Sequence, residues 1–412
     1  MKTAILTVGT EILFGQVVNT NAAYLSTQLQ NIGYDVMYHY TVGDNPGRLK
    51  ELLEFAYHDC DLIITTGGLG PTQDDLTKEI ISEYFEEKIV EFPHITAWLK
   101  DRFKRSGYNW TDNNLKQAFF PEHCTILNNP GGTAPGFMLK KNGKMIAALP
   151  GPPREMEAMW TNELMPKLKK DSDGFIYYRI IKTFGIGEST LETVLLPLID
   201  GQTDPTIATY AKEGECSLRI TSKRSTKEEA ENAVNQMVAD VEKTIGKYIY
   251  SYDDEELLDV VGKLLIEKNI TISACESCTG GLFSKSLTDV PGISKVFNRG
   301  LTTYSWEAKI DELGVKRETL EQFTAESKEI ALEMVLGLKQ KTGSDICVSV
   351  TGIAGPDDLS EDRPAGLCYI GLSYKDKTFV VESRHRNVSR YWNRNYMLLR
   401  MLNEIYKLIK DA

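Results

Sequence analysis

The stretch ISACESCTGGLF at residues 272–283 decides the fold of the last third of the chain. The apolar run at 270–274 predicts a buried strand, and the spacing at 282–287 predicts an amphipathic helix. A strand that passes through a tight turn into a helix is typical of α/β domains. Such a turn directs unpaired N–H groups and the positive end of the helix dipole toward an anion bound beside Ser277. The alternative is that Ser277 or Thr279 only caps the helix.

The whole chain has the composition of a globular protein. Its 412 residues favour two or three domains, each large enough to bury a core. No apolar run approaches the roughly 18 residues of a membrane span. The first strand-like run ends at Gly9, too early for a signal peptide, so we expect a cytoplasmic protein without a membrane partner. The net charge of −11 argues against direct nucleic-acid binding, and the seven scattered cysteines suit a reducing compartment.

Residues 2–167 alternate between strand-like and helix-like periods. We expect strands at 3–8, 34–42 and 62–66, and helices at 21–32 and 46–57. This alternation predicts a doubly wound, mostly parallel sheet, in which ligands bind at the carboxyl ends of the strands.

Glycines and carboxylates follow each of these three strands. The first is followed by GTE at 9–11, the second by GDN at 43–45 and the third by GGLGPTQDD at 67–75. Glycines let the backbone approach a phosphate closely, and carboxylate oxygens suit a hard divalent cation. The candidate carboxylates are Glu11, Asp44, Asp74 and Asp75. The alternative for the last two is a helix cap.

The middle of the chain, from about residue 170 to 250, changes in pattern. Strands at 177–184, 206–211 and 216–221, followed by a charged helix at 226–246, predict a small α+β module with an architectural role. The acidic run DDEE at 253–256 then indicates a polar hinge before the next helix.

Residues 255–412 carry the chemistry that the ISACESCTGGLF stretch suggests. Further strands are expected at 296–304, 346–350, 366–373 and 378–382, with a long helix at 325–342. The strands at 270–274 and 346–350 both end in small and hydroxylated residues, as the floor of a pocket would.

The residue types in this last segment narrow the reaction. His385 is its single histidine, which argues against a Ser-His-Asp triad. Cys275 and Cys278 form a Cys-x-x-Cys, but neither a second pair spaced for zinc nor a thioredoxin-like context accompanies it. A serine–lysine pair remains, in which Lys309 acts as base if its surroundings lower its pKa and Tyr304 relays the proton or supports the lysine. The alternative for Lys309 is a solvated helix position.

The first third of the chain resembles a known fold. GGLGPTQDD, with Gly15 and Asn21 downstream of Glu11, resembles the molybdopterin-binding fold of the MogA-like proteins. The segments VGTEILFGQVVNTNAAYL, VGDNPGRL, NNPGGTAPGF and LPGPPREMEAMW extend the resemblance, over residues 1–168, to the N-terminal domain of the CinA (competence/damage-inducible protein A) family. The resemblance implies hydrolysis of the pyrophosphate of ADP-ribose with a divalent metal such as Mg²⁺.

The same resemblance assigns roles to residues. Asp44 and Asp74 fall on carboxylates that the MogA-like proteins use, and we expect them to hold the metal together with Asp75. The positions on the phosphate-side loops are Glu11, Gly67, Gly68 and Gly70.

The last third resembles the C-terminal CinA domain, a family of nicotinamide mononucleotide deamidases, through ESCTGG, TTYSWEAK, VTGIAGP and Arg390. This resemblance implies hydrolysis of the carboxamide of nicotinamide mononucleotide to nicotinate mononucleotide and ammonia, as in pyridine nucleotide recycling, with no cofactor and in a homodimer. Ser277 falls on the nucleophile, Lys309 on the general base and Tyr304 on its helper. The substrate-site positions are Thr279, Gly280, Gly281, Thr351 and Arg390.

This chain departs from the family pattern around the second site. Cys275 stands where the family has Ala, Trp306 where it has Asn, and Val388-Ser389 where a Gly-Asp pair precedes the arginine. The family is glycine-rich after GIAGP, whereas this chain has the acidic run DDLSED at 357–362. An acidic loop repels a phosphate unless it points away or binds a cation.

We therefore expect an α/β protein in three parts: a MogA-like domain at 1–168, a small α+β connecting domain at 169–251 and a deamidase domain at 252–412. Two hydrolase sites would make it a bifunctional enzyme. The rival hypothesis is a regulatory protein that binds nucleotides without turnover and acts in competence or the DNA damage response.

Overall fold

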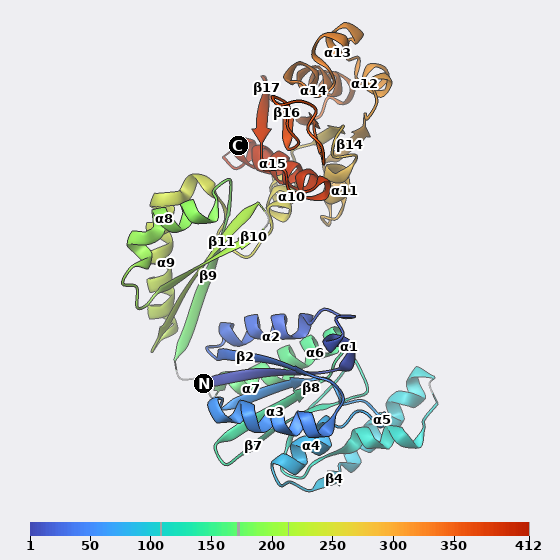
Figure 1. Cartoon of the computed structure of the whole chain (residues 1–412), viewed down its shortest axis with the longest axis vertical. Coiled ribbons are helices and arrows are strands. Elements are labelled where there is room, and N and C mark those ends of the chain that lie inside the picture. Colours follow the sequence, from blue (N-terminus) through green and yellow to red (C-terminus); the bar gives the residue numbers. More distant parts are fainter. Residues whose placement is uncertain (108, 171–173, 213, 412) are drawn as a thin grey trace. The chain divides into compact units, whose positions relative to one another are not determined.

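The computed structural model describes residues 1–107, 109–170, 174–212 and 214–411. By its contacts the chain divides into two compact units, Met1–Tyr177 with Lys223–Ala230 and Tyr178–Ser222 with Glu231–Ala412 (Figure 1). The three-part division stays a prediction. Among the described residues, no helix combines the length and the apolar composition that crossing a bilayer requires.

The first unit is built on a six-stranded sheet of order β2-β1-β3-β8-β7-β6. Its strands are β2 (Asp35–Val42), β1 (Lys2–Val8), β3 (Leu62–Thr66), β8 (Lys144–Leu149), β7 (Gly136–Lys141) and β6 (Thr125–Leu127). The pairs from β2 to β8 are parallel, whereas the β8–β7 and β7–β6 pairs are antiparallel. The predicted mostly parallel sheet is confirmed.

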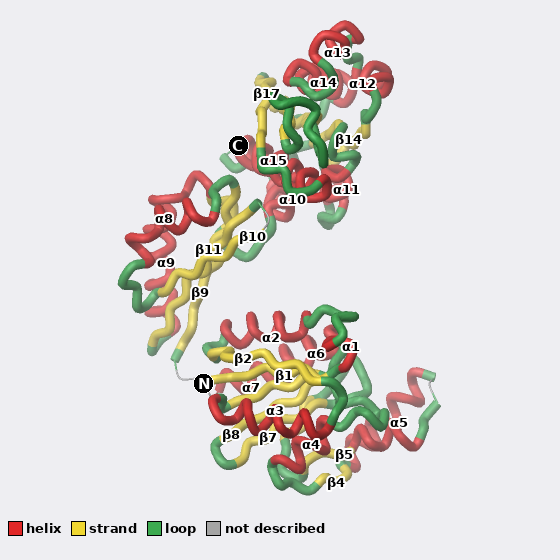
Figure 2. The backbone as a smooth tube through the Cα atoms, in the orientation of Figure 1, coloured by secondary structure: helices red, strands yellow, loops and turns green. Residues whose placement is uncertain are grey.

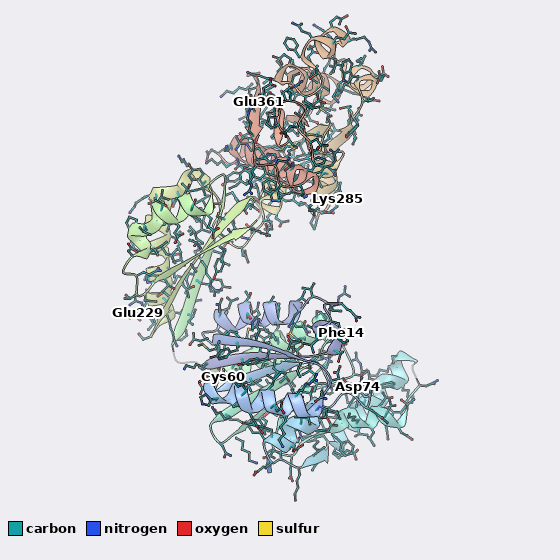
Figure 3. The ribbon with its side chains drawn as sticks, in the orientation of Figure 1. Phe14, Cys60, Asp74, Glu229, Lys285 and Glu361 are labelled. Atoms are coloured by element: carbon teal, nitrogen blue, oxygen red, sulfur yellow. The ribbon has the colours of Figure 1, made fainter. Side chains whose placement is uncertain are left out.

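Helices cover both faces of this sheet. Side chains of a strand alternate between the two faces, and β1 has apolar residues on both, so each face needs a covering layer. Ala4, Leu6 and Val8 pack in one core cluster, and Ile5 packs in the other. The first face is covered by α3 (Pro46–Asp59), α4 (Thr77–Tyr84) and α5 (Pro93–Ser106); the second by α2 (Thr20–Asn31), α6 (Pro153–Met159) and α7 (Met165–Lys170) (Figure 2). Cys60 lies just before β3 and Asp74 lies after it, so the two residues mark opposite ends of the strands (Figure 3).

The second unit begins with a four-stranded sheet of order β10-β11-β9-β12. The strands are β10 (Thr206–Lys212), β11 (Glu215–Arg224), β9 (Phe175–Phe184) and β12 (Ile249–Ser251), with helices α8 (Glu188–Ile199) and α9 (Lys227–Ile245). This is the predicted small α+β arrangement.

A five-stranded sheet of order β14-β13-β15-β16-β17 forms the rest of this unit. Its strands are β14 (Phe297–Thr302), β13 (Ile272–Glu276), β15 (Ile346–Gly352), β16 (Leu367–Tyr374) and β17 (Lys377–Arg384). The first three strands are parallel to one another, whereas the β15–β16 and β16–β17 pairs are antiparallel. The strand expected at 270–274 begins two residues later, because Ile270 N–H still bonds Leu265 O at the end of the preceding helix.

Two layers of helices enclose this sheet. One face packs against α10 (Leu257–Glu267), α11 (Leu282–Thr288) and α15 (Arg390–Ile409); the other against α12 (Trp306–Leu313), α13 (Arg317–Phe323) and α14 (Lys328–Thr342). In α14 the apolar residues Ile330, Met334 and Leu338 recur every fourth position and are fully buried.

The acidic segment predicted to be a hinge is bonded to the small sheet that precedes it. Lys182 Nζ lies 2.9 Å from Asp254 Oδ1, and Lys212 Nζ lies 2.8 Å from Glu256 Oε1. Phe184 and Tyr250 also join the core cluster of the five-stranded sheet. These contacts explain why residues on both sides of the segment belong to one compact unit.

Candidate functional site

Ser277 sits on a sharp turn at the carboxyl end of β13. Its N–H donates to Val350 O at 3.0 Å, and its carbonyl accepts from Gly280 N at 3.0 Å. Gly280 and Gly281 have φ values of 59° and 90°, a left-handed conformation that favours glycine. The turn therefore holds Ser277 at the end of the strand, where 9% of its surface stays exposed.

Glu276, which the sequence reasoning missed, holds this turn together. Its carboxylate is fully buried and accepts hydrogen bonds from Thr279 Oγ1 at 2.7 Å, Phe283 N at 3.0 Å, and both the N–H and the hydroxyl of Ser284 at 2.9 and 2.7 Å. The N–H groups at the start of α11 are thus occupied by the protein's own carboxylate. This corrects both sequence hypotheses: α11 does not offer those N–H groups to a bound anion, and neither Ser277 nor Thr279 caps it.

We expect Glu276→Ala to lower the free energy of unfolding by about 2–5 kcal/mol, because it leaves buried backbone N–H groups of α11 without acceptors. Thermal or denaturant unfolding measures this change. Glu267→Ala, at an exposed position of α10, is the matched control and should be nearly neutral. Equal stability of the two variants would mean that Glu276 does not hold the turn.

Lys309 lies fully buried on α12, which begins where the Ser305 hydroxyl accepts from Ala308 N at 3.0 Å. Its Nζ is 3.1 Å from Ser277 Oγ, 2.7 Å from Thr303 O and 3.1 Å from Tyr304 O. The alternative of a solvated lysine is wrong. Burial lowers the pKa of Lys309, whereas the charge of Glu326 acts in the opposite direction.

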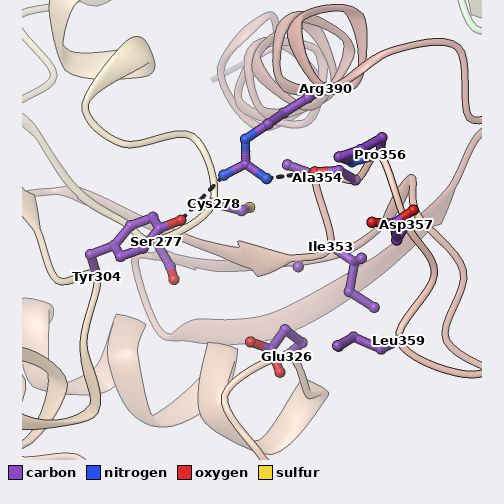
Figure 4. A pocket seen from close by; sticks show the side chains of 12 residues that line it. Ser277, Cys278, Tyr304, Glu326, Ile353, Ala354, Pro356, Asp357, Leu359 and Arg390 are labelled. Atoms are coloured by element: carbon purple, nitrogen blue, oxygen red, sulfur yellow. Dashed lines mark hydrogen bonds between the residues drawn. The ribbon is translucent and has the colours of Figure 1, made fainter.

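Tyr304 and Arg390 bond to each other rather than to the lysine amine. Arg390 donates from Nη2 to Tyr304 Oη at 3.2 Å and from Nη1 to Gly355 O at 2.6 Å (Figure 4). Only the carbonyl of Tyr304 accepts from Lys309, and its phenol belongs to a side chain that is 60% exposed. Tyr304 therefore supports the lysine through its backbone, and its phenol positions Arg390.

Ser277, Tyr304 and Arg390 face one cavity of about 310 Å³ at the carboxyl ends of β13 and β15. Its lining includes Ser277, Tyr304, Glu326, Asp357 and Arg390. Of the acidic loop at 357–362, Asp357 and Leu359 line the cavity, whereas Asp358 accepts from Ala365 N and Asp362 accepts from the Ser360 hydroxyl.

Thr351, expected at the substrate site, is fully buried, and its hydroxyl donates to Ala325 O at 2.7 Å. The side chain therefore supports the floor of the cavity without lining it. The cysteines are also structural: Cys275 and Cys278 pack in different core clusters, and both thiols are free.

A second cavity, of about 390 Å³, lies at the carboxyl edge of the first unit's sheet. It brings together all the residues predicted there: Glu11, Asp44, Gly67, Gly68, Gly70, Asp74 and Asp75. A Cβ on Gly67 would come within 2.1 Å of Val8 O, and one on Gly68 within 2.1 Å of Thr77 Oγ1. These positions need glycine, so the backbone itself forms the wall of the cavity.

The carboxylates of this cavity bond to neighbouring hydroxyls. Asp44 accepts from Thr10 Oγ1 at 2.8 Å, and Asp74 and Asp75 both accept from the hydroxyl of Thr72. Within the described ranges, no three His, Cys, Asp or Glu side chains form a cluster that could hold a metal ion. The carboxylates fit Mg²⁺ only in the mode in which one or two of them act together with substrate phosphates.

Lys116, which the sequence reasoning also missed, fixes the loop that carries Asp74 and Asp75. Its Nζ donates to Thr72 O and Asp75 O, at 3.0 and 2.5 Å. Lys116 lies on the segment 112–118, far along the chain from this loop, and no local pattern connects them.

Comparison with known proteins accounts for nearly the whole chain. Three family models match it: the probable molybdopterin binding domain at residues 4–170, the damage-inducible protein CinA KH domain at 178–251 and the CinA C-terminal domain at 254–409. A putative competence-damage inducible protein of Clostridium botulinum (strain Okra / Type B1) is 45% identical over 403 residues, which cover 98% of each chain. The chain belongs to the CinA family.

A second relative agrees with this assignment. A putative competence-damage inducible protein of Acetivibrio thermocellus is 48% identical over 384 residues, 93% of each chain. Among solved structures, CinA from Thermoplasma acidophilum is 36% identical with a TM-score of 0.38, covering 41% of this chain and 97% of that one. In this CinA-family chain, the first cavity described lies in the region of the C-terminal domain, and the second in that of the molybdopterin-binding domain.

Proposed function

We propose that the CinA C-terminal domain of this chain hydrolyses the carboxamide of nicotinamide mononucleotide to nicotinate mononucleotide and ammonia. The observation that carries the proposal is the buried contact of 3.1 Å between Lys309 Nζ and Ser277 Oγ. A serine hydroxyl is a weak nucleophile until a neighbouring base takes its proton, and this contact supplies that base.

The surroundings of Lys309 suit a neutral amine. A neutral amine has two N–H bonds and one lone pair, and the carbonyls of Thr303 and Tyr304 accept from this nitrogen at 2.7 and 3.1 Å. The lone pair then faces the Ser277 hydroxyl, which donates to it. Because burial lowers the pKa of Lys309, the neutral form costs less here than in water, where the pKa is about 10.4.

The reaction then has two halves. Ser277 Oγ attacks the carboxamide carbon while its proton passes to Lys309, and Lys309 returns that proton to the leaving nitrogen, which departs as ammonia. Water attacks the resulting ester with Lys309 again as base; the acid is released and Ser277 regains its proton. Since Glu276 accepts from Phe283 N and Ser284 N, these N–H groups at the start of α11 are not donors to the developing oxyanion.

Release of ammonia from nicotinamide mononucleotide by the purified protein tests this proposal against the regulatory hypothesis. Turnover that disappears in Ser277→Ala supports an amidase. Binding of the nucleotide without turnover would favour a regulatory protein, and turnover that survives the substitution would place the nucleophile elsewhere.

We expect Tyr304→Phe to have a mild effect, below about tenfold on kcat, because the phenol contacts Arg390 and not the amine of Lys309. The pH profile separates the two roles. Activity rises with pH as Lys309 loses its proton, and this rise should keep its midpoint in Tyr304→Phe while KM increases. A shifted midpoint would mean that the phenol acts on the lysine after all.

The cavity of the molybdopterin-binding domain supports a second activity, hydrolysis of the pyrophosphate of ADP-ribose. Its support is the gathering of glycine backbone and carboxylates at one sheet edge. Asp74 and Asp75 would hold a divalent cation together with the substrate's phosphates, and the cation would neutralise charge on the phosphoryl oxygens.

A further inference from the structure

Charged side chains of both signs line the cavity around Ser277: the cation Arg390 and the carboxylates Glu326 and Asp357. Arg390 and Glu326 both line the cavity, and the close-up shows them on opposite sides of it (Figure 4). Two of the N–H donors of Arg390 are used by Gly355 O and Tyr304 Oη, so further donors remain for an anion. The carboxylate of Glu326 accepts no hydrogen bond from the part of the chain that the structure describes.

The position of Glu326 is well defined although its carboxylate is unpartnered. Arg363 Nη2 donates to Glu326 O at 2.7 Å and also to Thr324 Oγ1. The next residue, Ser327, caps α14 by accepting from Ile330 N at 3.3 Å. The backbone on both sides of Glu326 is therefore held, and the half-buried side chain is directed into the cavity.

This carboxylate opposes the reaction that the cavity is proposed to perform. Its negative charge raises the pKa of Lys309 and so favours the protonated lysine, which cannot act as base. Neutral or apolar side chains at this position would leave the lysine more reactive. A charge with this cost is explained if it contributes to binding the substrate.

Resting on the proposed function, we infer that Glu326 is a specificity-determining residue that pairs with the positive ring of an N-substituted pyridinium carboxamide, while Arg390 takes its anionic phosphate. In such a nucleotide the quaternary ring nitrogen is positive and the phosphate is negative. In the bound nucleotide Arg390 would face the phosphate and Glu326 the ring, so that each charge meets its opposite. The cavity would then select this zwitterion over neutral carboxamides of the same size.

Two probes of nearly the same size differ by one hydride and hence in ring charge: nicotinamide mononucleotide, with a positive pyridinium, and its reduced form, with a neutral dihydropyridine. Both keep the carboxamide and the phosphate. In the full-length Ser277→Ala protein, calorimetry should show at least about tenfold tighter binding of the oxidised form. Glu326→Gln in the same background should abolish this preference, and Glu326→Asp, which restores the charge, should recover most of it.

The matched control is Glu329→Gln, at an exposed position in the first turn of α14 that does not line the cavity. It should keep the preference. A preference that persists in Glu326→Gln, or that is absent before the substitution, would overturn the inference. The two proposals can fail separately. If the binding preference depends on Glu326 but the wild-type protein releases no ammonia, the inference stands and the proposed hydrolysis is rejected.

The pH profile of turnover gives an independent reading. The charge of Glu326, on the segment before α14, raises the pKa of Lys309; the nearby thiols Cys275 on β13 and Cys278 on the turn are neutral because burial raises their pKa values. Removing the charge of Glu326 therefore lowers this pKa, and the rise of activity with pH should shift to lower pH in Glu326→Gln. A residue that only maintained the fold would leave that midpoint unchanged, and such a result would contradict the placement of the charge.

Discussion

Ser277→Ala and Lys309→Ala should each lower kcat for ammonia release from nicotinamide mononucleotide by at least about a thousandfold. Removing the serine removes the atom that attacks the amide. Removing the lysine leaves the hydroxyl without a base, since the buried amine of Lys309 lies 3.1 Å from Ser277 Oγ. Steady-state ammonia release by the two variants and the wild type measures both effects.

The double variant should be little worse than either single variant, because the two side chains act as one unit. Lys316→Ala, at an exposed lysine just before α13, is the control for general effects of losing a lysine and should keep nearly full activity. Near-normal activity in Lys309→Ala would show that the base lies elsewhere. Near-normal activity in Ser277→Ala would leave the serine a structural role in the turn.

Asp74→Ala should abolish cleavage of ADP-ribose, with a loss of at least about a hundredfold, and a chelator should do the same to the wild type. The carboxylate lies in the cavity beside Gly70 and Asp75, where the pyrophosphate and its cation would be held together. Cleavage is measured by release of AMP with and without added Mg²⁺.

Asp112→Ala, at an exposed aspartate outside this cavity, is the matched control and should retain activity. Ammonia release should be unaffected by Asp74→Ala, because Ser277 and Lys309 belong to the other compact unit. Cleavage that needs no divalent metal and survives Asp74→Ala would contradict this assignment.

Local patterns determined much of the fold. The strands of the first sheet and the helices between them follow from apolar periodicity. β3 lies at the predicted residues 62–66, and all five of its residues are buried, as expected for a central parallel strand covered on both faces. Glycines and carboxylates after successive strands also predicted their meeting at one edge, since parallel strands end on the same side.

Interactions distant in sequence were decided only by the tertiary structure. In the parallel sheet, Glu276 pairs with Thr302, which brings the residues after β13 beside those after β14. This register places Lys309 against Ser277, 32 residues away along the chain, and buries its amine. Motifs suggested the pair, but the burial of the amine and its contacts with Ser277, Thr303 and Tyr304 depend on the fold.

The direction of individual side chains was likewise beyond the sequence. The sequence placed Thr351 at the substrate site, but its side chain turns into the core. No motif marked Glu326, which lines the cavity. Glu276 caps a helix that begins after it in the chain because the turn folds its carboxylate back onto Phe283 and Ser284. The pattern of a strand specifies which residues alternate between its two faces, whereas the packing of neighbouring elements decides which side chain lines the cavity.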